Sequence, residues 1–344
     1  MINRILVVKT SSLGDIIQSL PVASELKAHF PNVEIDWVVE DAYKDLLSFH
    51  PLIDSVIIFN RHNLIKFIMK LRRKKYDSLI DIQGNTKSAL ITFFARASEK
   101  VGFGKKSVTE FPNLLVTTYK YNVPKDINIQ SYYLELVKKH FSIQNFSGKG
   151  SLNLAINQND LPKELELNDQ RLKVMVAMNS ARKNKELDNA TLASFLQKFN
   201  SHYLIHLYFI YGSEQEKEKC NYLKSQIGEN CDILSKMSIP ILQNVMDKMD
   251  LILTIDTAAL YLGGTTSTVT FSVFGPTNNK VFVPLGKHFS LQGTCPYKVK
   301  YVKQCPHLRS CSTSACIKKI TLEKLWSEFQ PCLLEIKAHN FQNY

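Results

Sequence analysis

Apolar and polar positions alternate in a regular way along the first part of the chain. Short runs rich in β-branched residues are each followed by a polar turn, and then by a stretch whose apolar residues recur at helical spacing. The runs are Ile5–Val8, Val33–Val39, Val56–Phe59 and Leu79–Ile82. Strands that alternate with helices in this way are typical of a parallel sheet covered by helices.

The same alternation starts again in the second half of the chain. Its predicted strands are Val174–Met178, Leu204–Tyr211, Leu251–Thr254 and Val269–Phe274. Between the two series, from residue 145 to 172, the periodicity gives way to Gly148, Gly150 and Pro162 among Ser, Asn and Asp. Such residues are typical of a junction between domains.

We therefore predict an α/β protein with two Rossmann-like, doubly wound domains, residues 1–160 and 161–320. Residues 321–344 are predicted to form a C-terminal helix with one apolar face. Parallel sheets bind ligands beyond the carboxyl ends of their strands, so two such domains that face each other create a cleft for substrates. The turns that follow the strands are the places where functional residues are expected.

The composition is that of an ordinary globular protein, since 44% of its 344 residues are hydrophobic and 22% are charged. These values exclude a disordered, collagenous or coiled-coil chain. The longest apolar runs are far shorter than the roughly 18 to 20 residues that cross a bilayer, and the first run is too short for a secretory signal. We expect a cytoplasmic protein whose seven cysteines are thiols.

Positive charge dominates the chain, because 43 Lys and Arg stand against 31 Asp and Glu, a net charge of +12. An excess of this size suits an anionic partner. Basic residues concentrate in the segment from Arg61 to Lys75, which contains no acidic residue. Apolar residues at helical spacing within it predict an amphipathic helix with one basic face. That face is either a solvated surface or a surface for anionic lipid.

The turn after the first predicted strand carries a candidate catalytic group. Ser11 and Ser12 lead to Gly14 and Asp15, where a helix is expected to begin. The amides of a first helical turn stabilise a carboxylate at that place. Asp15 is therefore either a general base or the cap of the helix, and both interpretations stay open.

Other predicted strand ends carry polar and cationic side chains. Gln83 and Lys87 follow the fourth strand in a turn suited to a polar group or an anion. Ser180 and Lys185 lie in a turn with three cationic groups, where a lysine would neutralise a diphosphate. Glu214 ends another strand, where a carboxylate accepts hydrogen bonds from ribose hydroxyls in other nucleotide-binding sheets. A solvated loop is the alternative for the turn that carries Lys185, and it is the preferred interpretation for Arg182 and Lys183.

Asp256 and Thr257 stand where a further strand passes into a helix, whose free N–H groups would form a phosphate site. A capping aspartate explains the same residues. Neither Gly-x-Gly-x-x-Gly nor the Gly-Lys-Ser/Thr ending of a P-loop follows any predicted strand. We therefore expect neither a nicotinamide dehydrogenase nor a P-loop kinase.

Four of the cysteines lie close together in sequence, namely Cys295, Cys305, Cys311 and Cys316, and His307 lies among them. Their spacing lacks the Cys-x-x-Cys pairs of common zinc sites. A structural metal is the less favoured interpretation, and we expect neither a metal nor a cofactor.

Four motifs taken together resemble the ADP-heptose:lipopolysaccharide heptosyltransferases of glycosyltransferase family 9, and in particular heptosyltransferase I. They are the segments 9–15 (KTSSLGD), 83–88 (QGNTKS), 256–257 (DT) and 273–277 (VFGPT). The motifs follow the family's order and spacing, and the tail from Cys305 to Cys316 resembles that of many members.

The resemblance implies a GT-B fold, with the acceptor bound on the N-terminal domain and the nucleotide-sugar on the C-terminal one. It implies inverting, metal-independent transfer of L-glycero-D-manno-heptose from ADP-heptose to a Kdo residue of lipid A, in assembly of the lipopolysaccharide inner core. The implied place is the cytoplasmic face of the inner membrane, with peripheral contact to its anionic surface.

The family's functional residues can be carried over to matching positions. Asp15 matches the proposed general base. On the donor side, the resemblance implies that Ser180 and Lys185 contact the diphosphate, that Glu214 contacts the adenosine ribose, and that Asp256 and Thr257 contact the donor sugar and its phosphate. On the acceptor side, it implies that Ser11, Ser12 and Gly14 form the turn around the base. Gln83 and Lys87 match the family's polar turn, and Arg61 matches a residue that contacts the acidic acceptor.

Two positions of the donor pocket depart from the family pattern. Ala258 stands where a glycine is usual, and Tyr261 stands where a histidine is expected. Tyrosine still offers a hydroxyl donor but changes the pocket, so another nucleotide-sugar or a heptosylated core acceptor stays open as an alternative. A non-catalytic basic domain is a rival from another class. It gives no reason for carboxylates at strand ends, and we expect no nucleic-acid partner.

Overall fold

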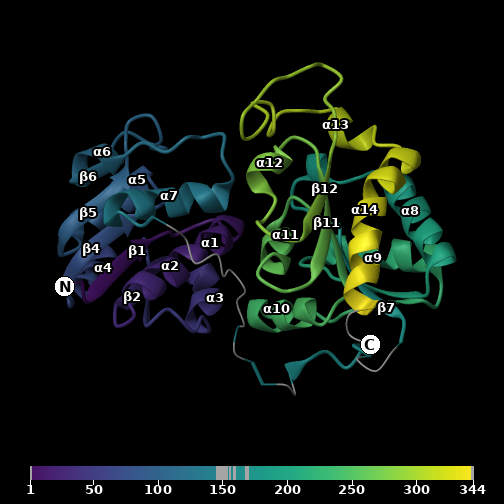
Figure 1. The fold of residues 1–344 in the computed structure, drawn as a ribbon, viewed down its shortest axis with the longest axis horizontal. Helices are drawn as coiled ribbons and strands as arrows, with labels where there is room; N and C mark the ends of the chain where they lie inside the picture. Colours follow the sequence, from purple (N-terminus) through teal and green to yellow (C-terminus); the bar gives the residue numbers. More distant parts are fainter. Residues whose placement is uncertain (1, 145–153, 155, 158–159, 167–169, 342–344) are drawn as a thin grey trace. The chain divides into compact units, whose positions relative to one another are not determined.

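The computed structural model describes residues 2–144, 154, 156–157, 160–166 and 170–341, with side chains through residue 336. The chain divides into two compact units, residues 1–155 and 156–344. Each unit is built around one six-stranded parallel sheet (Figure 1). Much of the predicted junction, with Gly148 and Gly150, lies outside the described residues.

The first unit alternates strands and helices as the hydrophobic pattern predicts. Its strands are β1 (Arg4–Val8), β2 (Glu34–Glu40), β3 (Ser55–Phe59), β4 (Tyr76–Asp81), β5 (Ala97–Phe103) and β6 (Tyr119–Tyr121). Its helices are α1 (Leu13–Ser19), α2 (Pro21–His29), α3 (Lys44–Ser48), α4 (Leu64–Leu71), α5 (Thr86–Phe94), α6 (Asn113–Val116) and α7 (Ile129–Phe141). The strands lie in the order β3-β2-β1-β4-β5-β6.

The second unit repeats this plan. Its strands are β7 (Leu172–Ala177), β8 (Ile205–Phe209), β9 (Cys231–Ile233), β10 (Leu251–Ile255), β11 (Val269–Phe274) and β12 (His288–Gln292). Its helices are α8 (Asn189–His202), α9 (Glu214–Ile227), α10 (Ile239–Asp247), α11 (Ala258–Gly263), α12 (Asn279–Phe282), α13 (Ala315–Lys318) and α14 (Leu322–Phe341). The strands lie in the order β12-β11-β10-β7-β8-β9.

The central strands of both sheets are buried on both faces, which explains their continuous apolar runs. The apolar residues of β1 and all of β10 and β11 are buried. Helices cover both faces of a parallel sheet, so its strands carry near-continuous Val, Ile and Leu rather than alternating residues. All eight predicted strands are present, with ends that differ by at most three residues.

The structure corrects the picture of the basic segment. A helix does form, α4, but only Phe67 and Leu71 of its apolar residues are buried, and Ile65 is 77% exposed. Lys74 lies beyond the helix, and its ammonium group pairs with Glu34 and with the buried Asp36. The segment is therefore not one continuous basic face, and its exposed side also carries apolar residues.

The C-terminal helix α14 packs on the second unit, against β11, β12 and α8 (Figure 1). Leu325 and Phe329 are buried in that core, and the Phe329 ring makes edge contacts with those of Phe195 and Phe271. Among the residues that the structure describes, no helix combines the length and the hydropathy that crossing a membrane requires.

Candidate functional site

Each sheet has one place where the strand order reverses, and Asp15, Gln83, Lys185 and Asp256 lie in the turns beside these places. In the first unit the chain winds outward from β1 to β3 and then returns to β4 on the other side of β1. In the second unit it winds from β7 to β9 and returns to β10 beside β7. Loops leave such a point in opposite directions and open a crevice, which is where doubly wound sheets bind their ligands.

Gln83 connects the two turns at the reversal point of the first unit. Its side-chain Oε1 accepts hydrogen bonds from the backbone N–H groups of Thr10 (3.0 Å) and Ser11 (3.3 Å). The next residue, Gly84, has a φ of +68°, in the left-handed region that glycine tolerates best. A Cβ atom there would lie 3.3 Å from the Phe103 ring. The side chain of Gln83 thereby joins the turn after β4 to the turn after β1.

A buried carboxylate anchors this turn. The side chain of Asp81, the last residue of β4, accepts hydrogen bonds from the backbone N–H groups of Gln83 (3.0 Å) and Gly84 (2.9 Å). Thr92 (3.0 Å) and Asn113 (2.6 Å) donate to its other oxygen. Burial raises the pKa of Asp81, and these hydrogen bonds act in the opposite direction. Asp81 is a positioning residue, because its oxygens are occupied within the protein.

Asp15 lies at the start of α1 and is partly exposed. Its Oδ2 accepts hydrogen bonds from the backbone N–H (3.1 Å) and the hydroxyl (2.8 Å) of Ser12. The capping interpretation is thus confirmed. It does not compete with a role as a base, since within the described part of the chain Oδ1 receives no hydrogen bond. Gly14, the residue before it, lies in the first turn of the same helix.

Lys9 places a buried cation beside this carboxylate. It is only 4% exposed, and its ammonium nitrogen lies 5.1 Å from the centre of the Tyr133 ring. Burial lowers the pKa of Lys9, while the charges of Asp15 and Asp81 favour its charged form. Within one unit the structure therefore brings a carboxylate, a cation and an aromatic ring to the end of β1.

A cavity of about 760 Å³ opens at the ends of β2 and β3 in the same unit. Its lining includes four cationic side chains, those of Arg61, Lys66, Lys70 and Lys87. Lys87 forms an ion pair with Glu40, so an anion in the cavity competes with that carboxylate for Lys87. The Arg61 Nε lies 3.2 Å from the His62 ring nitrogen. An anionic ligand suits this lining.

In the second unit Lys185 and Asp256 meet at the reversal point. The ammonium group of Lys185 donates to the Asp256 carboxylate and, at 3.1 Å, to the Asp256 carbonyl oxygen. The Tyr261 hydroxyl donates to Oδ1 of Asp256, and the Thr277 hydroxyl donates to Oδ2 at 2.7 Å. Asp256 is 5% exposed and Lys185 14% exposed. The turns after β7, β10 and β11 thus converge on one carboxylate.

Thr257 rather than Asp256 is the N-cap residue of α11. The alternative in which Asp256 only caps this helix is therefore wrong, because its carboxylate bonds to residues of other turns. Ala258 is the first residue of α11 and is partly exposed. Tyr261, one turn further on, reaches back to Asp256 through its hydroxyl. The residue that departs from the family pattern is thus part of the centre of the site.

A buried ion pair supports the turn that carries Ser180. The Glu186 carboxylate accepts from the backbone N–H of Ser180 (2.9 Å) and pairs with Lys219 (3.1 Å) and the exposed Lys183 (3.3 Å). Glu186 and Lys219 each have 8% of the side chain exposed. The Ser180 hydroxyl accepts from the backbone N–H of Arg182 at 3.1 Å. Glu186 and Lys219 do not occur in the quoted motifs, and the sequence reasoning missed them.

Glu214 is the first residue of α9 and is exposed. The hydrogen bond that closes its turn comes from a neighbour instead, since the backbone N–H of Gly212 donates to the Glu216 carboxylate at 2.6 Å. The Ser213 hydroxyl caps the helix by accepting from the Glu216 N–H at 3.3 Å. The Glu214 carboxylate stands at the end of β8 and is accessible to a ligand.

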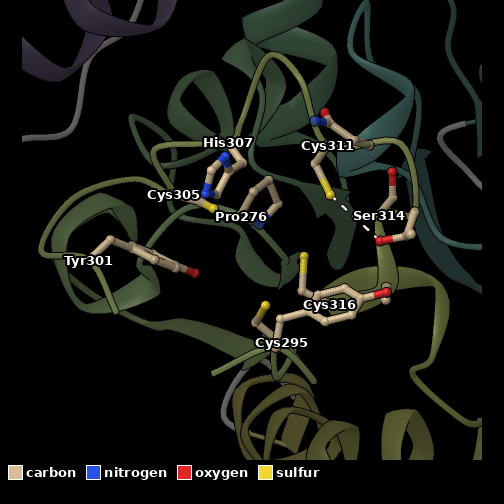
Figure 2. Close-up of a pocket in the computed structure, with 12 residues that line it drawn as sticks. Pro276, Cys295, Tyr301, Cys305, His307, Cys311, Ser314 and Cys316 are labelled. Atoms are coloured by element: carbon tan, nitrogen blue, oxygen red, sulfur yellow. Dashed lines mark hydrogen bonds between the residues drawn. The ribbon is translucent and has the colours of Figure 1, made fainter. Parts of the chain in front are cut away.

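The cysteine-bearing loop lies beside the turn that carries Thr277. The backbone N–H of Cys305 donates to the Pro276 carbonyl oxygen (2.7 Å), and the Tyr301 hydroxyl donates to that of Gly275 (3.0 Å). In Figure 2 the thiols of Cys295, Cys311 and Cys316 point toward a small cavity of about 30 Å³.

All seven cysteines are free thiols. Across the described ranges no three His, Cys, Asp or Glu side chains are arranged to hold a metal ion. Burial raises the pKa of the Cys316 thiol to about 11, whereas hydrogen bonds from Ser314 and Thr313 lower that of Cys311.

Two parallel doubly wound units are the architecture of the GT-B fold. A family model described as glycosyltransferase family 9 (heptosyltransferase) matches residues 64–308. The chain belongs to this family and is a glycosyltransferase.

Individual proteins agree with this assignment. The chain is similar to lipopolysaccharide heptosyltransferase 1 of Campylobacter coli, with 24% identity over 80% of this chain and 84% of the relative. Lipopolysaccharide heptosyltransferase 1 of Escherichia coli K12 is 23% identical over 83% of this chain and 92% of the relative.

Two solved structures share the fold. E. coli heptosyltransferase WaaC with ADP-2-deoxy-2-fluoro heptose has a TM-score of 0.74 at 22% identity, over 95% of this chain and 99% of the other. A family 9 glycosyltransferase from Veillonella parvula has a TM-score of 0.77 at 18% identity, over 97% of each chain.

Proposed function

We propose that this glycosyltransferase transfers heptose from ADP-L-glycero-D-manno-heptose to a Kdo residue of lipid A, in the lipopolysaccharide inner core. The contacts among Lys185, Asp256 and Tyr261 carry the proposal, because they place a cation and hydroxyl donors where a doubly wound sheet binds a nucleotide. Curated relatives named lipopolysaccharide heptosyltransferase 1, and a structural neighbour that holds an ADP-heptose analogue, support the choice of donor.

The proposed division of labour follows the chemistry of each unit. The cationic cavity near Arg61 suits the carboxylate and phosphate groups of Kdo-lipid A. The second unit would hold ADP-heptose, with Ser180 and Lys185 at the diphosphate and the accessible Glu214 at the ribose. Asp256 and Thr257 would contact the donor sugar and its phosphate, within a pocket that Ala258 and Tyr261 complete.

The proposed reaction is a single inverting displacement. Asp15 removes the proton of the acceptor hydroxyl while that oxygen forms a bond to the anomeric carbon, and the bond from this carbon to the ADP oxygen breaks. Negative charge grows on the leaving diphosphate, so Lys185 binds it more tightly in the transition state than before. The positive charge at the leaving group thus comes from a side chain, which supports the proposed metal independence.

A second candidate is the same chemistry with another nucleotide-sugar or with a heptosylated core acceptor. Tyr261 motivates it, because a tyrosine replaces the histidine of the family pattern beside the sugar-binding carboxylate. Profiling tests both: the enzyme is given Kdo-lipid A with ADP-heptose, ADP-glucose or UDP-N-acetylglucosamine, or a heptosylated core acceptor with ADP-heptose, and the product mass is measured. We expect a product only from Kdo-lipid A with ADP-heptose. A product from another combination, and none from this one, would replace the first candidate by the second.

A lipid-linked acceptor requires the reaction to take place at a membrane surface. The proposal therefore includes peripheral contact of this chain with the anionic cytoplasmic face of the inner membrane.

A further inference from the structure

Exposed apolar side chains concentrate on one part of the first unit. Seven of the fifteen exposed large hydrophobic residues of the described chain lie on or next to α4, α5 and α6. They are Leu64, Ile65, Met69, Leu90, Phe93, Phe111 and Leu115. Helix α5 contacts both α4 and α6, so the three helices form one continuous stretch of surface. We call it the α4–α6 surface.

Five of these apolar side chains are each more than half exposed to solvent. Ile65 and Met69, one turn apart on α4, are 77% and 65% exposed. Phe93 of α5 is 62% exposed, and Leu115 of α6 is 72% exposed. Single exposed apolar residues are ordinary, but adjoining ones on neighbouring helices mark an interaction site.

Three cations lie near the end of α5, and none of them has a carboxylate partner among the residues that the structure describes. The Lys100 ammonium group donates to the Phe93 carbonyl oxygen (3.1 Å), the Arg72 guanidinium to that of Phe94 (3.2 Å), and Arg96 to that of Arg72 (3.4 Å). The first two bonds satisfy the last carbonyls of α5, and the third satisfies that of the C-cap residue of α4, as cations at a helix end commonly do. They also place three like charges together, and the Arg72 charge, after burial, lowers the pKa of Lys100.

The sequence of the α4–α6 surface contains almost no negative charge. No Asp or Glu occurs from residue 61 to 76, from 82 to 98, or from 111 to 125. Two carboxylates lie between α5 and α6 in sequence, and each has a partner. Glu110 is bound to the Thr86 hydroxyl and backbone N–H, and Glu99 lies 3.1 Å from the His140 ring nitrogen. Apolar side chains flanked by cations, with few acids, are the composition of surfaces that bind at anionic lipid interfaces.

We propose that the α4–α6 surface docks the enzyme on an anionic bilayer, with Phe93, Leu115, Ile65 and Met69 inserted at the level of the headgroups and Arg72, Arg96 and Lys100 against lipid phosphates. The inference rests on the proposed lipid-linked acceptor. It extends that proposal, because it assigns docking to side chains outside the cationic cavity. Charge complementarity selects the bilayer over a second copy of this chain, since two such surfaces repel each other.

Vesicle binding tests the proposal without donor or acceptor, so it does not depend on whether the proposed reaction is correct. The full chain is sedimented with vesicles of phosphatidylglycerol mixed with phosphatidylcholine, and with phosphatidylcholine alone. We expect binding to the anionic vesicles that weakens with added salt. Each cation near such a surface contributes about fivefold to partitioning, so R72Q/R96Q/K100Q should bind at least about tenfold more weakly.

The apolar half of the proposal has its own variants and controls. F93S/L115S should also bind at least about tenfold more weakly, whereas L204S, at an equally exposed position of the second unit, should bind as the wild type does. K236Q/K318Q/K319Q removes three exposed cations of the second unit and is the matched control for charge. Thermal unfolding checks that each variant is folded. If R72Q/R96Q/K100Q does not fold, vesicle binding of F93S alone provides the test.

Two results would overturn the proposal. One is wild-type binding that neither set of variants reduces. The other is no binding of the wild type to the anionic vesicles. Self-association in sedimentation velocity that F93S/L115S abolishes would then assign the surface to a second copy of the chain.

Discussion

The Lys185 ammonium group contacts the Asp256 carboxylate, although 71 residues separate the two in sequence. The contact joins the turns after β7 and β10, the neighbouring strands between which the order of the second sheet reverses. Tyr261 and Thr277 donate to the same carboxylate. This centre fixes the position of the lysine that the proposed reaction needs at the leaving diphosphate.

A double-mutant cycle measures how strongly this pair is coupled. Removing one partner of a fully buried pair costs about 3–5 kcal/mol. Lys185 retains some exposure, so we expect K185M and D256N each to lower the free energy of unfolding by about 2–3 kcal/mol. The double variant should lose at least about 1 kcal/mol less than the sum. Urea unfolding provides the measurement.

The exposed pair of Asp41 and Lys44 is the matched control, because its side chains are 68% and 44% exposed. Its coupling should stay below about 1 kcal/mol. Strictly additive losses at Lys185 and Asp256 would show that their contact does not organise the site.

Tyr261→Phe removes the hydroxyl that donates to Oδ1 of Asp256. Loss of a hydrogen-bond donor to a partly buried carboxylate costs about 1–2 kcal/mol. We expect the binding free energy of the ADP-sugar to fall by a similar amount, which is roughly tenfold in affinity. Calorimetric titration with the nucleotide-sugar measures the affinity. Tyr222→Phe, at an exposed position of α9, serves as the control. Unchanged affinity in Y261F would remove Tyr261 from the donor site.

The buried pair of Glu186 and Lys219 should matter for ADP binding although neither residue lies at the end of a strand. Among the residues that the structure describes, Lys219→Met leaves the Glu186 carboxylate with only the exposed Lys183 as a cation. We expect a loss of about 2–4 kcal/mol in unfolding free energy and weaker ADP binding through a displaced Ser180 turn. The acceptor KM should not change. E218Q, elsewhere on α9, should behave as the wild type, and equal ADP affinity in K219M would contradict the positioning role.

Stability should fall in mild acid because of a buried histidine. Burial lowers the pKa of His50 from 6.5 to about 4, and its Nδ1 accepts the backbone N–H of Leu52 at 3.1 Å. The unfolded chain therefore binds a proton between pH 6.5 and 4 that the folded chain does not. The stabilisation is complete above pH 6.5 and declines as the pH falls through this window.

Between pH 7 and 5 this single group should account for about 2 kcal/mol of lost unfolding free energy. Urea unfolding of the wild type and of His50→Asn at both values provides the test. The variant should start less stable and show a smaller decline. An equal decline in both proteins would show that His50 does not cause it.

Much of the fold could be predicted from the sequence, because buried parallel strands appear in it as continuous apolar runs. The four strands that were missed lack this signal. β5 contains Glu99 and Lys100, β6 and β9 have three residues each, and β12 begins with a histidine. Edge strands and short strands bury less, so tertiary pairing rather than their own pattern determines them.

The candidate site was predictable only as a set of strand ends. Parallel topology brings Lys185 and Asp256 to one edge, but local pattern does not reveal that they pair, or that Thr277 joins them. For Thr277 a signal existed, since it follows Gly275 and Pro276 at the end of β11. Glu186 and Lys219 offered none, because a buried ion pair looks like two surface charges until the chain is folded.

The most direct test of the central claim is a mass-spectrometric transfer assay with ADP-heptose and Kdo-lipid A, with EDTA present, that compares the wild type with Asp15→Asn. Asparagine can still accept the hydrogen bonds of Ser12, so the start of α1 should persist and ADP binding should remain. We expect the wild type to add one heptose, and D15N to be slower by about 10²- to 10⁴-fold. Near-normal turnover by D15N, or no heptose transfer by a folded wild type that binds ADP, would contradict the account.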